Sequence, residues 1–165
     1  MIDDPKIIED FCDESLDLVD QLEACLEELD ADITNTGHLE IFGQIIDRIM
    51  GAAKTLEIEN IATICELGKV IGYKSSQSKD EKLLTIVVAT LFDTVYLIRK
   101  ILTQLKKNHS EQLSQISTKA FADRLRWLAD KFKHIERSSC IVEDNKEKEK
   151  LDQNSIDDLL SSLGL

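Results

Sequence analysis

The segment Leu39–Thr55, LEIFGQIIDRIMGAAKT, carries apolar side chains at the spacing that one face of an α-helix requires. Residues three and four positions apart lie on the same side of a helix, so the segment predicts an amphipathic helix with one buried and one exposed face. On both sides of this segment the same spacing recurs. The residues expected to face the core are Phe42, Ile45, Ile46, Ile49, Met50 and Ala53.

Four other segments are predicted to be helical. The first begins with Asp4, a residue type that caps helices, and with Pro5, which suits the first helical position. Breaks are expected at Thr34–Gly37, in the Ser-rich stretch Lys74–Lys79 and at Asn108–Ser110. The helices expected after the second one cover roughly residues 58–72, 80–107 and 117–136.

The composition is that of one helical domain with a tail. The chain has 165 residues, and its single Pro, six Gly and 5% aromatic residues disfavour a β-sandwich. Leu, Ile, Glu, Asp and Lys are abundant, as they are in helical bundles. We therefore expect an all-α fold, an antiparallel up-down bundle of about five helices over residues 1–137.

The acidic balance and the cysteines argue against several classes of function. The formal net charge of −12 disfavours binding to nucleic acid or to an anionic membrane, since both need a cationic surface. The longest apolar stretch, Leu83–Ile101, is interrupted by charged residues, and no signal peptide is visible, so no membrane insertion is expected. The four cysteines form no CxxC pair and no cluster with histidine, so we expect buried thiols, a cytoplasmic location and no metal site.

The end of the chain differs in character from the bundle. Residues 138–154 carry many charges of near-balanced sign and are expected to form a flexible linker. Residues 155–165, SIDDLLSSLGL, predict a short amphipathic helix that Ser155 caps and Gly164 ends. Because so short a helix is marginal in water, we expect it to fold into a groove on a partner. The residues expected to contact that partner are Ile156, Asp157, Asp158, Leu159, Leu160 and Leu163.

This C-terminal segment resembles the C-terminal peptide of the chemotaxis phosphatase CheZ. In that family the peptide binds the response regulator CheY, and similar Asp-Asp/Leu-Leu peptides occur in flagellar switch proteins that bind the same regulator. The resemblance implies that the partner is a CheY-type response regulator. The alternative from the residues alone is a frayed helical end without a partner.

The bundle resembles the histidine phosphotransfer domain of the chemotaxis kinase CheA. Phe11–Leu16 and Leu22–Leu29 look like the opening helix of that domain. Ile41-Phe42 and Asp47–Leu56 look like its central motif, which normally reads His-x-x-Lys-Gly-Ser/Gly-Ala-Gly-Thr-Leu/Phe. The resemblance implies a histidine-phosphotransfer-like bundle.

The centre of that motif departs from the family. The phosphorylated His falls on Asp47, which cannot carry a phosphoimidazole, and the neighbouring Lys falls on Met50. Gly51 remains where the family keeps a small residue for the close approach of a receiver domain. The resemblance therefore implies that the docking face survives while the transfer chemistry is lost. His38 and His109, beside the expected breaks, are interpreted as surface residues that do not replace the missing phosphosite, as is His134.

One face of the helix predicted at Leu39–Thr55 also carries a candidate catalytic pair. Glu40, Gln44, Asp47 and Gly51 lie at i, i+4, i+7 and i+11 and share one side of the helix. Residues 40–46 resemble the catalytic stretch of CheZ, in which a Gln orients the water that attacks the acyl phosphate and an acid four residues earlier pairs with the regulator's lysine. The resemblance implies catalytic roles for Gln44 and Glu40 and partner contacts for Asp47 and Gly51. The regulator would hold Mg²⁺, and no cofactor is expected in this chain.

The four-residue spacing of Glu40 and Gln44 also permits an interpretation without catalysis. An acid four residues before a Gln is common on exposed helices, where the pair is merely solvated, and Asp17 with Gln21 repeats it. The catalytic hypothesis requires Gln44 to be exposed on the folded bundle.

These patterns lead to one expected function and two alternatives. We expect a chemotaxis signalling protein whose C-terminal peptide tethers a CheY-type regulator while the bundle promotes loss of its phosphate. The first alternative is a non-catalytic adaptor or sink that only binds regulators, and the second is a phosphate relay, which the missing His at Asp47 disfavours. The sequence leaves monomer and homodimer open, although phosphatases of the resembled family are dimers.

Overall fold

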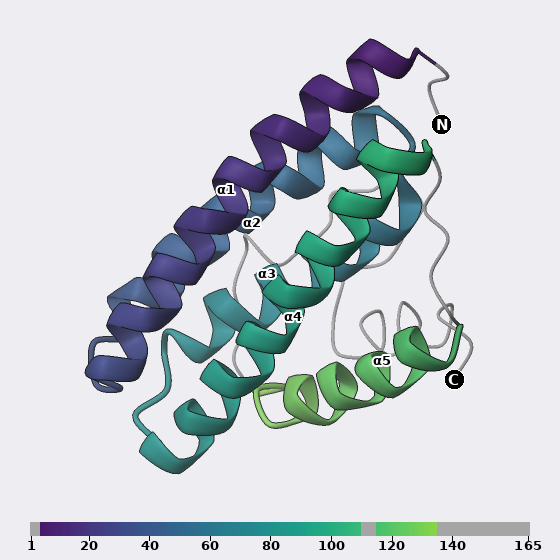
Figure 1. Cartoon of the computed structure of the whole chain (residues 1–165). Helices are drawn as coiled ribbons and strands as arrows, with labels where there is room; N and C mark the ends of the chain where they lie inside the picture. The colour runs from purple at the N-terminus through teal and green to yellow at the C-terminus, as the bar shows by residue number, and fades with distance from the viewer. Residues whose placement is uncertain (1–3, 110–114, 135–165) are drawn as a thin grey trace, which may run out of the picture.

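The computed structural model describes residues 4–109 and 115–134, which form five helices (Figure 1). They are α1 (Pro5–Ala31), α2 (Gly37–Thr55), α3 (Glu59–Ser75), α4 (Glu81–Asn108) and α5 (Gln115–Asp130). The described residues contain no strand, and the all-α prediction is confirmed. The expected linker at 138–154 and the expected peptide at 155–165 lie outside the described residues.

Short-range capping explains where three of the helix ends fall. The Asp4 carboxylate accepts a hydrogen bond from the Lys6 backbone N–H at 3.0 Å, ahead of Pro5, and so starts α1. The Asp80 carboxylate accepts from the Leu83 N–H at 3.1 Å and starts α4. His109 takes the left-handed conformation, with φ of 50°, and ends α4 at the expected break.

Three predicted boundaries are wrong. α2 begins at Gly37, inside the break expected there. α3 continues through Lys74 and Ser75, which were expected to lie in a loop, and the Ser75 hydroxyl bonds back to a carbonyl within the helix. α5 ends at Asp130 instead of near residue 136, since residues 131–134 form a turn. Phe132 in that turn is still buried, so the helical spacing of apolar residues continues past Asp130. This spacing therefore does not reveal where α5 ends.

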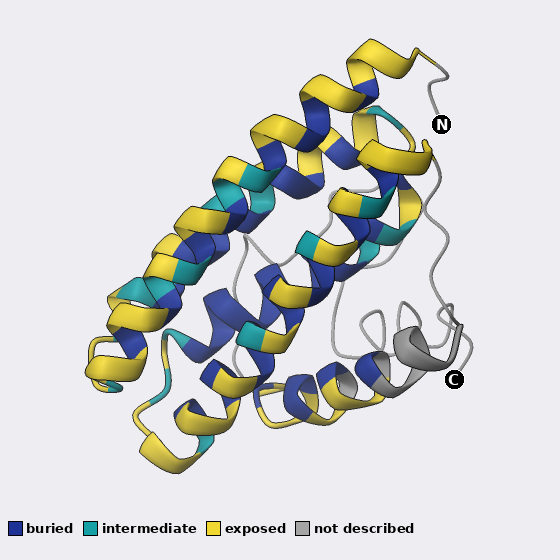
Figure 2. Cartoon of the chain, in the orientation of Figure 1, coloured by how far each residue is buried: buried dark blue, intermediate teal, exposed yellow. Residues whose placement is uncertain are grey.

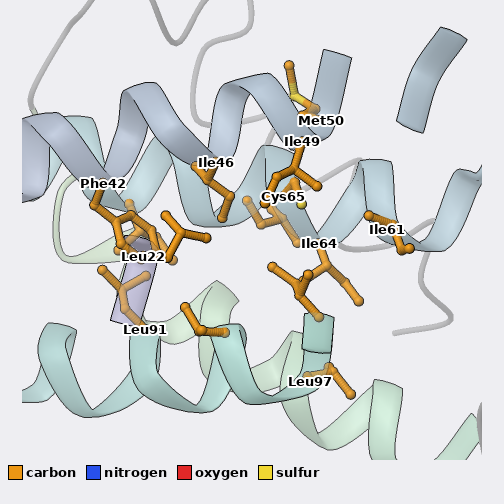
Figure 3. Close-up of a cluster of buried hydrophobic side chains, with 14 of the residues drawn as sticks. Leu22, Phe42, Ile46, Ile49, Met50, Ile61, Ile64, Cys65, Leu91 and Leu97 are labelled. Atoms are coloured by element: carbon orange, nitrogen blue, oxygen red, sulfur yellow. The ribbon is translucent and has the colours of Figure 1, made fainter. Parts of the chain in front are cut away.

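The first four helices pack as a ring. α1 contacts α2 and α4, and α3 also contacts α2 and α4, while α5 packs at an angle on the outside of α3 and α4 (Figure 1). Figure 3 shows part of the core inside the ring, to which α2 contributes Phe42 and Ile46, α3 contributes Cys65, and α4 contributes Leu91. With three neighbouring helices, α3 is buried on nearly every side, including the polar residues Glu66, Lys69 and Lys74.

Ion pairs between exposed or half-buried side chains join α1 to α4. Arg99 contacts Asp20 and lies 3.0 Å from Glu23, and Lys106 contacts Asp13. From Arg99 to Lys106 the residue numbers rise along α4, whereas those of their partners on α1 fall from Glu23 to Asp13. The remaining acidic side chains of α1 form the exposed side of this helix (Figure 2). Among the described helices, none combines the length and apolar character that crossing a bilayer would require.

Candidate functional site

The side of α2 that faces away from the core carries all four residues singled out on this helix. Gln44 and Gly51 are exposed, and Glu40 and Asp47 are half-buried. Phe42, Ile46 and their apolar neighbours hold the opposite side of α2 in the core, and this fixes which residues reach the surface. Glu40, Gln44, Asp47 and Gly51 therefore lie along one outward row.

Two of these residues belong to a row of polar contacts between α2 and α3. Ser76 Oγ lies 3.4 Å from Glu40 Oε2, Lys69 Nζ lies 3.1 Å from Asp47 Oδ1, and Lys54 Nζ lies 3.2 Å from Glu66 Oε1. We call these three contacts the polar seam. Its α2 members are seven residues apart, or two helical turns, so each faces α3 in the same way.

The middle contact of the polar seam brings a cation to Asp47. Lys69 comes from α3, and its side chain is 11% exposed, whereas the Asp47 side chain is 44% exposed. Reasoning from the family motif expected no cation here, because the motif's Lys falls on Met50. Lys69 was not predicted from the sequence, because its proximity to Asp47 depends on how α2 is aligned with α3. The one sequence signal is that Lys69 and Ser76 are seven residues apart, the same separation as between Glu40 and Asp47.

Gln44 lies between the two acidic residues of the row. Its side chain makes no hydrogen bond to any other residue in the described part of the chain. The carboxylate of Glu40 is directed to Ser76 and that of Asp47 to Lys69. The amide of Gln44 is therefore the group of this row that remains available to a molecule bound from outside.

A small residue and an apolar residue lie on the same helix as Gln44, Gly51 two turns after it and Ile41 about one turn before it. A Cβ added at Gly51 would meet no atom within 4 Å, so packing inside the chain does not require glycine there. Ile41, one turn before Gln44, is 44% exposed although it is a large apolar residue. No binding role was predicted for Ile41 from the sequence. The outward side of α2 thus combines an available amide with an apolar side chain and open space.

The cysteines of the described residues, Cys12, Cys25 and Cys65, lie on α1 and α3 and not on this side of α2. Burial and the Asp13 carboxylate raise the pKa of Cys12 to about 11, and burial raises the pKa of Cys65 and of Cys25. The reactive thiolate form is therefore disfavoured at all three. Among the described residues, no group of three His, Cys, Asp or Glu side chains is arranged to hold a metal ion.

A cavity of about 650 Å³ lies away from the outward row of α2. It is formed by the α3–α4 loop, the start of α4 and the turn after α5. The residues that line it include Lys79, Asp80, Lys131 and His134. None of the candidate residues of α2 lines it.

The predicted contact residues of the tail, Ile156, Asp157, Asp158, Leu159, Leu160 and Leu163, lie outside the described residues. Comparisons of the chain with protein-family models, with curated proteins and with solved structures found no match.

Proposed function

We propose that this protein binds a CheY-type response regulator and promotes hydrolysis of its aspartyl phosphate. The observation that carries the proposal is the exposed Gln44 amide, which has no hydrogen-bond partner in the described part of the chain and lies between Glu40 and Asp47. An amide that can both donate and accept is able to hold a water molecule against a phosphorus atom. The exposure of Gln44 meets the condition that the catalytic hypothesis sets.

The proposed chemistry needs positioning and little else. A water held by the Gln44 amide attacks phosphorus while the bond between phosphorus and the regulator's aspartate oxygen breaks. The aspartate leaves as a carboxylate, and the oxygen and both protons of the water end in dihydrogen phosphate, which can release a proton to solvent. Orienting one water in line supplies catalysis without a covalent intermediate on this chain. Mg²⁺ belongs to the regulator in this scheme.

The surroundings of Gln44 suit a docking surface for the regulator. In the proposed arrangement the four-helix part is a histidine-phosphotransfer-like antiparallel bundle whose outward α2 face meets the regulator. Ile41 offers apolar contact area, and the open space at Gly51 lets a partner backbone approach closely. A glycine within a helix costs about 1 kcal/mol relative to alanine, and no internal contact of Gly51 offsets this.

The C-terminal peptide has a separate role in this proposal. Residues 155–165 bind the regulator and keep it close to the bundle, while the cytoplasmic location provides access to it. Tethering converts the encounter at α2 into an intramolecular step, which raises the effective concentration of the regulator there.

One kinetic experiment tests the catalytic part of the proposal. A CheY-type regulator is phosphorylated with acetyl phosphate, and its loss of phosphate is followed with and without the protein. We expect the wild-type protein to accelerate the loss and Gln44→Ala to abolish most of the acceleration. Gln21→Ala is the matched control, because Gln21 is exposed on α1 and also follows an acid, Asp17, by four residues. Equal rates for Gln44→Ala and wild type would refute the catalytic role.

The second candidate is a non-catalytic adaptor, which the contact between Asp47 and Lys69 favours. The resembled motif has its phosphohistidine where this chain has Asp47, and pairing of that carboxylate with Lys69 supports a surface that binds a regulator without accepting its phosphoryl group. Under this alternative the regulator binds with measurable affinity, but its phosphate is lost no faster than in the regulator alone.

A further inference from the structure

Lys69 lies beside the proposed catalytic surface. Its ammonium group is 3.1 Å from Asp47 Oδ1, and Asp47 is one helical turn from Gln44 on the same side of α2. The Lys69 side chain is 11% exposed, so most of it is enclosed, whereas the Asp47 side chain that it contacts is 44% exposed.

The charges around Gln44 would oppose the proposed substrate without Lys69. An acyl phosphate is anionic, and the carboxylates of Glu40 and Asp47 flank Gln44 in a protein whose net charge is −12, with the exposed Arg48 one turn further along α2 as the cation of this side of the helix. Like charges at this range repel, and partial exclusion of water on docking strengthens the repulsion. Cancelling the charge of Asp47 removes one of these two obstacles.

The other ion pair of the polar seam shows what a purely structural contact looks like. There the carboxylate of Glu66 is 8% exposed and the Lys54 side chain is 42% exposed, so the lysine serves to satisfy a buried acid. At the middle contact the order is reversed, since the acid reaches solvent and the lysine is enclosed. Water would satisfy Asp47 without Lys69, and an apolar side chain would fill the position of Lys69 at lower desolvation cost.

We propose that Lys69 is a specificity-determining residue that cancels the charge of Asp47 and so lets the Gln44 surface accept the phosphorylated form of its regulator. This inference rests on the proposed function. It makes Lys69 a positioning residue that acts through Asp47, without contact to the phosphoryl group. Its predicted effect is on the choice between phosphorylated and unphosphorylated regulator, which differ in charge at the docking site.

The test compares two constants for the same protein. KM is measured for the regulator phosphorylated with acetyl phosphate, and Ki is measured for the unphosphorylated regulator as a competitive inhibitor. For Lys69→Met we expect KM to rise on the order of tenfold while Ki changes little, since one uncompensated charge about 8 Å from a dianion has an effect of this size. For Lys69→Arg, which keeps the charge, we expect both constants within about twofold of wild type.

A second-site variant separates charge from shape. Lys69→Met combined with Asp47→Asn removes both charges, so we expect KM to return close to the wild-type value. Lys54→Met is the matched control within the polar seam, because it also removes a lysine charge but lies more than two helical turns from Gln44, beyond the range of strong interaction in salt. We expect it to lower thermal stability and to leave the ratio of KM to Ki unchanged.

The possible failures are distinguishable. If KM and Ki rise together in Lys69→Met, or if the double variant does not restore KM, Lys69 is structural and the inference is wrong. If the wild-type protein does not accelerate phosphate loss, or Gln44→Ala leaves the rate unchanged, the proposed function fails and the inference with it.

Discussion

Gly43 and Gly51 occupy the same helix but have opposite surroundings. A Cβ at Gly43 would lie 2.6 Å from ring atoms of Tyr73, while one at Gly51 would meet nothing within 4 Å. We predict that Gly43→Ala lowers the free energy of unfolding by about 1–3 kcal/mol, because α3 must move away from α2. Gly51→Ala should raise it by up to about 1 kcal/mol, since alanine favours the helix. Urea unfolding of the two variants measures both changes.

The buried thiols give the protein a dependence on alkaline pH. Burial and Asp13 raise the pKa of Cys12 to about 11, and burial raises the pKa of Cys65. The unfolded chain loses these protons first, at an ordinary thiol pKa of about 8.5. The free energy of unfolding should therefore be unaffected by the thiols below about pH 8.5 and should decrease as the pH rises toward 10.

Chemical denaturation at a series of pH values measures this dependence. The control is the variant with Cys12→Ala and Cys65→Ala, which lacks both thiols. Its stability is expected to fall less steeply between about pH 8.5 and 10 than that of the wild type. Equal slopes would mean that other groups cause the alkaline loss.

At the scale of the helices, the polar seam gives a prediction about the contact between α2 and α3. Lys54→Met leaves the carboxylate of Glu66, which is 8% exposed, without the ammonium group that lies 3.2 Å from it. We expect a loss of about 1–3 kcal/mol in unfolding free energy, the range found when a buried polar group loses its hydrogen bond. Lys106→Met, which breaks an exposed contact with Asp13 between α1 and α4, should change stability little. Similar losses in the two variants would show that Glu66 is not held by Lys54.

The sequence predicts the helices better than it predicts their surroundings. Local spacing identifies all five helices, and local capping by Asp4 and Asp80 fixes two of the starts. The all-round burial of α3 could not be predicted in this way, because it depends on the packing of α5 and on the close approach of α2 at Gly43. Long-range packing also decides which polar side chains, such as Lys69, are enclosed.

At the scale of the whole molecule, the candidate site also combines features that local spacing predicts with features that depend on packing between helices. The common face of Glu40, Gln44, Asp47 and Gly51 follows from helical spacing, and the exposure of Gln44 follows from the apolar residues opposite it. The partners of Glu40 and Asp47 come from another helix and appear only when α2 and α3 are aligned. The residues of the surface could thus be predicted from the sequence of α2 alone. Which of their charges are paired could not, because this depends on how α3 packs against α2.

The proposed division of labour between the bundle and the C-terminal peptide gives the last prediction. A chain that ends at residue 154 keeps every described residue and should unfold at the same temperature as the full chain. Loss of the tether should raise KM for the phosphorylated regulator about 10²-fold or more and leave kcat unchanged, because the peptide raises effective concentration without taking part in chemistry.

The full-length variant with Leu159→Ala and Leu160→Ala should reproduce this rise in KM, because it removes the apolar contacts but keeps the length and charge of the tail. Steady-state kinetics at regulator concentrations above and below KM separate the two constants. A fall in kcat at unchanged KM would place the peptide in the chemical step and contradict the tether. Unchanged kinetics in both variants would mean that the bundle alone recognises the regulator through the surface around Gln44.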